Sequence, residues 1–146
     1  MKVAEWLRLH PGDTVTLGPE WPLERILDRL LATPGLRDLY VADAKGRLLG
    51  HISHRRLAQM VLIEHRPVHT RRQILERVAR GSARELMEPH FASARPEEEL
   101  DDVLDHLLEH GVENMPVVDA AGHSLGVINL TEVLAALRPG SKPAAD

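Results

Sequence analysis

The sequence contains no cysteine, which excludes disulfide bonds, thiolate catalysis and zinc sites built on cysteine. Aromatic residues make up only 3% of the 146 residues, so we do not expect single-stranded nucleic acid to bind on aromatic stacking platforms. No apolar run approaches the roughly 18 residues of a membrane span. The N-terminal segment meets charge at once and does not resemble a signal peptide. We therefore expect a cytoplasmic protein with no membrane span.

Hydrophobic residues make up 43% of the chain and charged residues 27%, which indicates a folded chain and not a disordered one. The length suits one domain or two small halves that share a core. The net charge of −4 is unevenly distributed, because residues 45–84 carry ten bases and two acids whereas residues 85–146 carry thirteen acids and three bases. This separation fits anion binding or pairing between oppositely charged parts, and it equally fits solvated faces without a function.

The sequence signatures of the common enzyme classes are missing. There is no G-x-S-x-G, H-E-x-x-H, P-loop or G-x-G-x-x-G motif. Among the nine histidines, His106 and His110 have a helical spacing that can hold zinc, but no third ligand is evident nearby, and surface histidines are favoured. We predict a non-enzyme with no catalytic residue, no metal ligand and no required cofactor.

The chain contains an internal repeat. Three blocks match in the same order in both halves, which decides the architecture. The blocks are 39–50 with 115–126 at an offset of 76, and 23–31 with 100–108 and 16–20 with 93–97 at an offset of 77.

Each copy is expected to form one β-α-β-β-α unit of about 50 residues, too small to bury its own core alone. The predicted fold class is therefore α/β (α+β), with two such repeats packed sheet to sheet. In the first copy we predict strands at 15–17, 39–42 and 48–53 and helices at 23–31 and 54–61. In the second copy, which should have the same order, we predict strands at 116–118 and 125–128 and helices at 100–108 and 130–137.

The predicted organisation has four segments. A first repeat with a short N-terminal lead-in covers residues 1–63, and a linker with a basic helix follows at 64–82. The second repeat covers residues 83–138, and a flexible tail covers 139–146.

One segment of the second copy resembles the motif of the cystathionine-β-synthase (CBS) domain. It runs from Gly111 to Asp119 (GVENMPVVD) and continues with Gly122 and Gly126-Val127-Ile128. The first copy resembles the motif less closely, because Tyr40 stands where the motif has proline. Two copies in tandem resemble a CBS pair, or Bateman module, over about residues 12–137. The resemblance implies pseudo-two-fold symmetry, clefts between the repeats that take adenosine compounds in some members, and a homodimer paired through helices.

The resemblance places ligand contacts where the third strand of each copy enters the last helix, in a Ser/Thr-x-x-Asp pattern. Polar groups beside a helix N-terminus can hold phosphate, and a carboxylate one turn later can accept ribose hydroxyls. These positions are Ser53 and Arg56 in the first copy and Asn129 and Glu132 in the second. Neither copy has the aspartate. Because Glu132 keeps a carboxylate, we favour Asn129 and Glu132 as the ribose site, and the Ser53/Arg56 site is either degenerate or suited to an anion.

Three further residues complete the candidate ligand contacts. Thr16 and Ser93 match a polar residue that often lies near adenine in the family, and Asn114 borders the implied cleft. Each candidate has a purely structural alternative. Asn129 with Glu132 forms a near capping box, Ser53 is an ordinary N-cap, and strand-end hydroxyls can bond to backbone.

Two functions follow from the resemblance. The first is a stand-alone regulatory module that binds AMP, ADP, ATP or S-adenosylmethionine and signals through an unidentified effector protein or self-association. The alternative is a ligand-free CBS-pair homodimer that acts as a protein-interaction scaffold, which Arg56 and the missing aspartates favour. Nucleic-acid binding through the basic stretch 54–84 is disfavoured. Parallel and antiparallel packing of the dimer both stay open.

Overall fold

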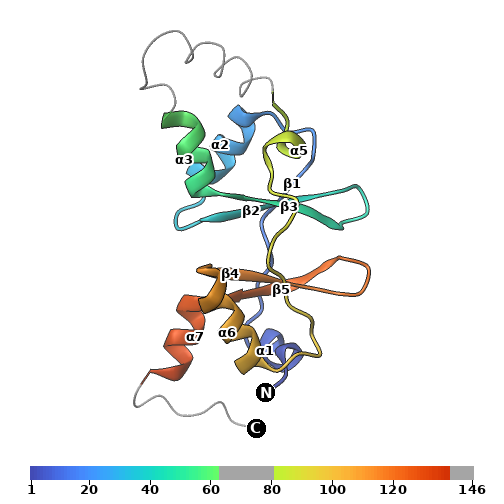
Figure 1. The fold of residues 1–146 in the computed structure, drawn as a ribbon, viewed down its shortest axis with the longest axis vertical. Helices are drawn as coiled ribbons and strands as arrows, with labels where there is room; N and C mark the ends of the chain where they lie inside the picture. The colour runs from blue at the N-terminus through green and yellow to red at the C-terminus, as the bar shows by residue number, and fades with distance from the viewer. Residues whose placement is uncertain (63–80, 139–146) are drawn as a thin grey trace. The chain divides into compact units, whose positions relative to one another are not determined.

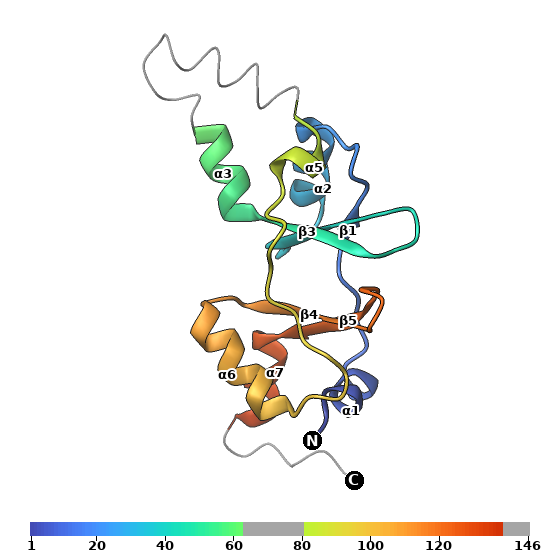
Figure 2. The same ribbon diagram turned by 45° about the vertical axis from the view of Figure 1, so that its right-hand side comes forward.

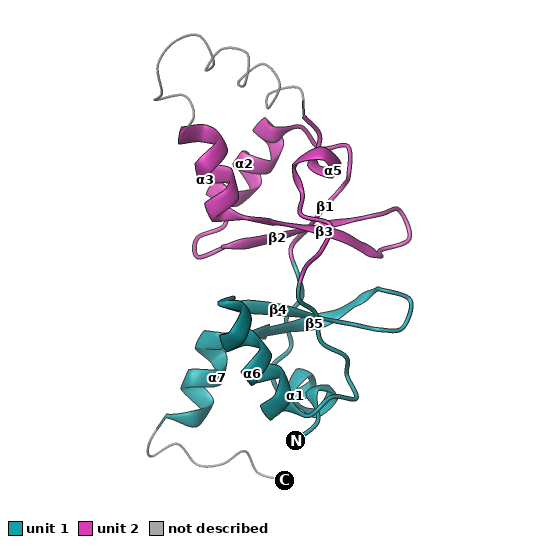
Figure 3. Ribbon diagram, viewed as in Figure 1, with its two compact units in different colours: residues 1–14, 92–146 teal, residues 15–91 magenta. Residues whose placement is uncertain are grey.

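The computed structural model describes residues 1–62 and 81–138. The chain divides into two compact units (Figure 3). Unit 1 consists of residues 1–14 and 92–146, and unit 2 of residues 15–91. The predicted basic linker helix at 70–80 and the tail at 139–146 lie outside the described residues.

Unit 2 is a three-stranded sheet with helices packed on one face (Figures 1 and 2). Strand β1 is parallel to β2, and β2 is antiparallel to β3. The alternation of β2 directs Leu39 and Val41 into the core beside Ile52 of β3. Along the chain, the elements are β1 (Thr16–Leu17), α2 (Leu23–Ala32), β2 (Asp38–Ala42), β3 (Leu48–Ser53), α3 (His54–Leu62) and α5 (Ala83–Leu86).

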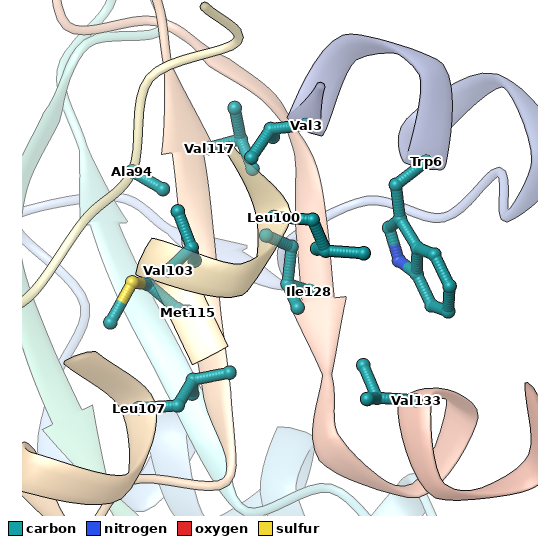
Figure 4. Close-up of a cluster of buried hydrophobic side chains, with 10 residues drawn as sticks. All are labelled: Val3, Trp6, Ala94, Leu100, Val103, Leu107, Met115, Val117, Ile128 and Val133. Carbon is teal, nitrogen blue, oxygen red and sulfur yellow. The ribbon is translucent and has the colours of Figure 1, made fainter. Parts of the chain in front are cut away.

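Unit 1 is built in the same way around a two-stranded antiparallel sheet. Its elements are α1 (Val3–Leu9), α6 (Leu100–His110), β4 (Asn114–Val118), β5 (Ser124–Asn129) and α7 (Leu130–Leu137). The side chains of α1, α6, α7 and both strands form one apolar core (Figure 4). Helix α6 ends at His110 and is capped by Gly111, whose φ of 63° is the left-handed conformation that glycine adopts without strain.

The two hairpins have the same register, which confirms the internal repeat and the mixed α/β fold class. The pair Leu39 and Ile52 corresponds to Met115 and Ile128. Each hairpin also has its register shift at the same place, after Val41 in one and Val117 in the other. In both turns a glycine with positive φ follows an aspartate whose carboxylate accepts two backbone N–H groups.

The first strand of the second copy differs from the expectation of identical element order. It is reduced to an isolated parallel bridge between Ala94 and Val117. In unit 2 the N–H of Tyr40 donates to the carbonyl of Val15 over 2.9 Å. Pro116 holds the equivalent position in unit 1 and has no N–H to donate. The departure from the motif at Tyr40 therefore adds a ladder hydrogen bond that the second copy lacks.

The N-terminal helix α1 belongs to the unit of the second repeat, although its sequence adjoins the first. Val3 and Trp6 are buried in the core of unit 1 (Figure 4). The N–H groups of Val3 and Ala4 donate to carbonyls of residues 98 and 96, each over 3.0 Å. Adjacency in the sequence predicts that the lead-in belongs to the first repeat, but its buried side chains place it in unit 1 with the second.

Helix α5 makes the matching contacts in unit 2. The N–H groups of Ala83 and Arg84 donate to carbonyls of Trp21 and Pro19, which lie 77 positions before the acceptors of α1. The internal repeat therefore extends further than the three aligned blocks, to residues 2–7 (KVAEWL) and 82–87 (SARELM). In each case the helix that precedes one repeat in sequence completes the core of the other.

Candidate ligand site

In unit 1, three predicted site residues meet at the corner where β5 enters α7. Asn129 is the N-cap of α7, and its Oδ1 accepts the backbone N–H of Glu132 over 3.1 Å. Its Nδ2 donates to Oδ1 of Asn114, directly opposite on β4, over 2.6 Å. The amide of Asn129 thus joins the helix start to the first residue of β4.

The first turn of α7 leaves little backbone unsatisfied. The N–H of Leu130 donates to the carbonyl of Glu113 over 2.9 Å, and that of Glu132 is taken by Asn129. In the described part of the chain, the N–H of Thr131 and the exposed carboxylate of Glu132 have no hydrogen-bond partner. One free N–H at the positive end of the helix can receive an anion, and the carboxylate can accept hydroxyls.

The corresponding corner of unit 2 has the same cap. Oγ of Ser53 accepts the N–H of Arg56 over 3.0 Å, and the N–H of His54 donates to the carbonyl of Arg37 over 2.8 Å. Ser53 and Arg56 therefore lie together at the position equivalent to Asn129 and Glu132. The corners differ in the side chain one turn into the helix.

Arg56 is committed to contacts within its own unit. Its Nε donates to the carbonyl of Leu86 over 2.7 Å, and its Nη1 lies 3.1 Å from Oε1 of Glu88. These contacts fix the end of α5 to α3, because a guanidinium presents several donors in one plane. Glu132 makes no such contact in unit 1, so the two corners have different chemistry.

Thr16 and Ser93 lie at equivalent exposed positions before the buried Leu17 and Ala94. Thr16 pairs with Tyr40 on β2, so the whole of β2 separates it from Ser53 on β3. Ser93 precedes the bridge to β4 in the same way. Within each unit, the structure brings together the strand-to-helix residues and leaves these two hydroxyls at the other side of the sheet.

The sequence reasoning missed a polar cluster on β2 and β3. His51 Nε2 lies 2.6 Å from Oδ1 of Asp38, and the His51 ring stacks on Tyr40 with centroids 4.9 Å apart. Phe91 meets Tyr40 edge to face at 5.7 Å. Burial raises the pKa of the Tyr40 hydroxyl far above its ordinary value, and the charge of Asp38 adds to the effect. Strand alternation was the available signal, since it places Asp38 and Tyr40 on the face opposite Leu39.

The described residues contain neither a candidate metal site nor a candidate membrane-spanning helix. Across the described residues, no group of three or more histidine, aspartate or glutamate side chains is arranged to hold a metal ion. His106 and His110 instead contact each other edge to face. None of the described helices is both long enough and apolar enough to cross a bilayer.

A comparison with protein families decides the classification. The family model of the CBS domain matches residues 10–62 and again residues 83–139. The chain belongs to the CBS-domain family. Both matched segments contain one strand-to-helix corner, so the two corners are equivalent parts of two CBS repeats. The comparison with curated proteins finds no match.

Solved structures of CBS pairs have the same fold at low sequence identity. CBSX2 in complex with AMP is 22% identical, with a TM-score of 0.73 over 92% of this chain and 94% of that chain. The CBS-domain pair of protein MJ0100, in complex with 5′-methylthioadenosine and S-adenosyl-L-methionine, is 16% identical, with a TM-score of 0.68 over 92% and 94%. The cytosolic domain of the Mg²⁺ channel MgtE, in complex with ATP, is 23% identical, with a TM-score of 0.65 over 85% of this chain. This CBS chain spans 45% of that MgtE domain.

Proposed function

We propose that this CBS pair is a regulatory module that binds an adenosine compound, namely AMP, ADP, ATP or S-adenosylmethionine, and passes the signal to an effector protein or to a second copy in a homodimer. The observation that carries the proposal is the repeated strand-to-helix corner within two matched CBS repeats. Structural relatives in complex with AMP, ATP and S-adenosyl-L-methionine support the ligand class. The proposed role is regulatory and not catalytic, and the proposed compartment is the cytoplasm.

In this proposal the corner of unit 1 is the ribose site. The carboxylate of Glu132 accepts the two ribose hydroxyls, while the N–H of Thr131 and the amide of Asn129 face the phosphate. Asn114 holds the Asn129 amide in place through the 2.6 Å hydrogen bond, and Ser93 lies toward the base. A ligand that binds one conformation of the module better than another shifts the population toward that conformation.

The corner of unit 2 is the weaker site in this proposal. Arg56 cannot accept ribose hydroxyls, and Leu86 and Glu88 already engage its guanidinium. Oγ of Ser53 already accepts a hydrogen bond from the backbone N–H of Arg56. These contacts favour a degenerate ribose site, at which the remaining nitrogens of Arg56 are left for an anion, and Thr16, across the sheet, stays a candidate contact of the base.

A thermal-shift panel tests the proposal. AMP, ADP, ATP and S-adenosylmethionine are compared with GMP, GDP and GTP, and with Mg²⁺ alone. A ligand at about 100 times its dissociation constant adds roughly 2.7 kcal/mol, which raises the melting temperature by roughly 5 °C for a chain of this size. A shift with an adenosine compound and none with its guanosine counterpart is expected. Equal shifts for both overturn the adenosine assignment.

The second candidate function is a ligand-free interaction scaffold. The contacts of Arg56 with Leu86 and Glu88 favour it. They give a structural role to a side chain that stands where the resemblance implies a ligand contact. The absence of a shift with every nucleotide and with S-adenosylmethionine at millimolar concentration selects the scaffold and overturns the sensor.

A further inference from the structure

The helices α1 and α5 hold equivalent places in the two units, but they differ in length. In the internal repeat, Trp6 of α1 corresponds to Leu86 of α5. Helix α5 ends at Leu86, and the chain then continues extended to Glu88, which pairs with β3. Helix α1 continues past Trp6 to Leu9 and is capped by His10. The carbonyl of Leu86 therefore lies at a helix end, whereas that of Trp6 lies within a helix.

Each of these two carbonyls is satisfied by a different donor. The Leu86 carbonyl accepts Nε of Arg56 over 2.7 Å. The Trp6 carbonyl accepts the backbone N–H of His10 over 2.9 Å and also lies 3.2 Å from Nδ1 of the His10 ring, which stacks on the indole with centroids 3.7 Å apart. Because a carbonyl oxygen only accepts and has two lone pairs, Nδ1 carries the hydrogen and His10 occupies both lone pairs.

In both units the first turn of the last helix packs against the helix that carries this carbonyl. Leu57 of α3 shares the core of unit 2 with α5, and Val133 of α7 shares the core of unit 1 with α1 (Figure 4). Arg56 and Glu132 directly precede these two core residues. By this equivalence, position 132 lies beside the Trp6 carbonyl as Arg56 lies beside its acceptor in unit 2.

A glutamate at position 132 requires that another group satisfy the carbonyl. Oε of glutamate stands at the same number of bonds from Cα as Nε of arginine, but it accepts hydrogen bonds and donates none. An open lone pair on the Trp6 carbonyl would therefore set two acceptors against each other. The ring of His10 removes this conflict. In the part of the chain that the structure describes, the carboxylate of Glu132 is exposed and has no hydrogen bond or ion pair.

We propose that His10 is a positioning residue of the unit 1 site. Because its ring engages the Trp6 carbonyl, position 132 is released from the structural role that Arg56 has in unit 2. Glu132 then presents its carboxylate to a ligand, and the ribose site lies in unit 1. The ligand part of this inference rests on the proposed function, whereas the coupling between His10 and position 132 needs no ligand.

A double-mutant cycle in urea denaturation tests the coupling without ligand. Glu132→Arg is introduced into the parent chain and into His10→Ala, in which the Trp6 carbonyl has a lone pair free for the new guanidinium. We expect Glu132→Arg to lower the unfolding equilibrium constant roughly 5-fold more in His10→Ala than in the parent. His110→Ala, which removes an exposed histidine of the same unit, is the control background and should behave as the parent. The same effect of Glu132→Arg in all three backgrounds overturns the inference.

Calorimetric titration of AMP tests the positioning role. We expect His10→Ala to raise the AMP dissociation constant ~3-fold or more, because the open lone pair on the Trp6 carbonyl repels the carboxylate that accepts the ribose. His10→Asn should restore the affinity, since Nδ2 of asparagine stands at the same number of bonds from Cα as Nδ1 and can donate to the same carbonyl. Both variants lose the ring stack, so a role of stacking alone predicts equal affinities. That result, or an unchanged affinity of His10→Ala, overturns the positioning role.

The two tests separate this inference from the proposed function. A parent chain that binds none of AMP, ADP, ATP and S-adenosylmethionine overturns the proposed function, and the cycle then decides alone whether His10 governs position 132. A chain that binds AMP but shows no coupling in the cycle overturns the inference and leaves the proposed function standing.

Discussion

Arg56 in α3 is hydrogen-bonded to the main-chain carbonyl of Leu86 in α5, with 2.7 Å between Nε and the oxygen. Thirty positions of sequence separate the two residues. Arg56 stands where the sequence resemblance predicts a ligand-binding aspartate, and its contact fixes α5 to α3 within the same unit. One position in the repeat therefore has a structural role in unit 2 and leaves a carboxylate open to solvent in unit 1.

Removal of the Arg56 side chain should destabilise unit 2. We expect Arg56→Ala to lower the free energy of unfolding by about 1–2 kcal/mol, because a charge-assisted hydrogen bond to a partly buried carbonyl is lost. Urea denaturation followed by circular dichroism measures the change. Arg84→Ala is the control, since Arg84 is an exposed arginine on α5 whose side chain has no hydrogen bond or ion pair within the described part of the chain. Equal losses in both variants would contradict the role of Arg56.

Asn129 should contribute to stability with no ligand present. Asn129→Ala removes the acceptor for the N–H of Glu132 and the donor to Asn114, and we expect a loss of about 1–2 kcal/mol in urea denaturation. Asn129→Asp keeps a capping oxygen and adds charge at the helix N-terminus but, like alanine, lacks the donor to Asn114, so its loss should be smaller than that of alanine without vanishing. The cap would be refuted if alanine and aspartate were equally destabilising.

Gly50 permits the close approach of the segment after α5. A Cβ atom there would collide with Sδ of Met87 and lie 2.9 Å from the carbonyl oxygen of Glu88. We expect Gly50→Ala to cost about 1–3 kcal/mol, because backbone cannot yield as a flexible side chain can. Gly12→Ala serves as the control, since no atom lies within 4 Å of the added carbon. A neutral Gly50→Ala would show that Met87 and Glu88 do not pack on β3 as described.

The two hairpin turns should make stability depend on acid. Backbone N–H bonds, above all from Arg47 to Asp43 and from His123 to Asp119, hold the pKa of both carboxyls below its ordinary value. A carboxyl whose pKa is lower in the folded state than in the unfolded state stabilises the fold at pH values above its unfolded pKa. That stabilisation is lost as the pH falls through the folded pKa, so the urea midpoint should drop between about pH 5 and pH 3.

The Asp43→Asn/Asp119→Asn variant should show a shallower acid loss, because its turn acceptors do not titrate. Asp101→Asn/Asp105→Asn, which alters two exposed carboxylates of α6, should keep the acid dependence of the parent chain. The turn assignment fails if both double variants have the same pH profile.

Much of the fold followed from the sequence because its determinants are local. The predicted strand 48–53 and helix 130–137 agree with β3 and α7 to the residue. The predicted turns contain Gly46 and Gly122 with positive φ. Polar caps, apolar periodicity and glycine positions determine the structure of only a few neighbouring residues. Strands, helices and turns can therefore be predicted from the sequence of a single copy of the repeat.

The remaining features depend on distant partners. The reduced first strand of the second copy follows from Pro116, whose missing N–H matters only once its neighbour Ala94 is known. Assignment of α1 to unit 1 requires the contacts of Val3 and Trp6 with residues about 90 positions away. Arg56 and Leu86 are 30 positions apart in the sequence. No hydrophobic periodicity in the sequence indicates that they are in contact. The grouping of Asn114, Asn129 and Glu132 was predicted, whereas its hydrogen bonds required the structure.

The most direct test of the central claim is calorimetric titration of AMP and ATP into the parent chain and into two variants. Glu132→Ala removes the proposed ribose acceptor, and Glu97→Ala removes another exposed glutamate of unit 1. We predict that Glu132→Ala weakens AMP and ATP binding at least ~10-fold, because hydrogen bonds to a charged group are lost, while Glu97→Ala binds as the parent does. Equal affinity of the parent chain and Glu132→Ala for both nucleotides would contradict the assignment of the site.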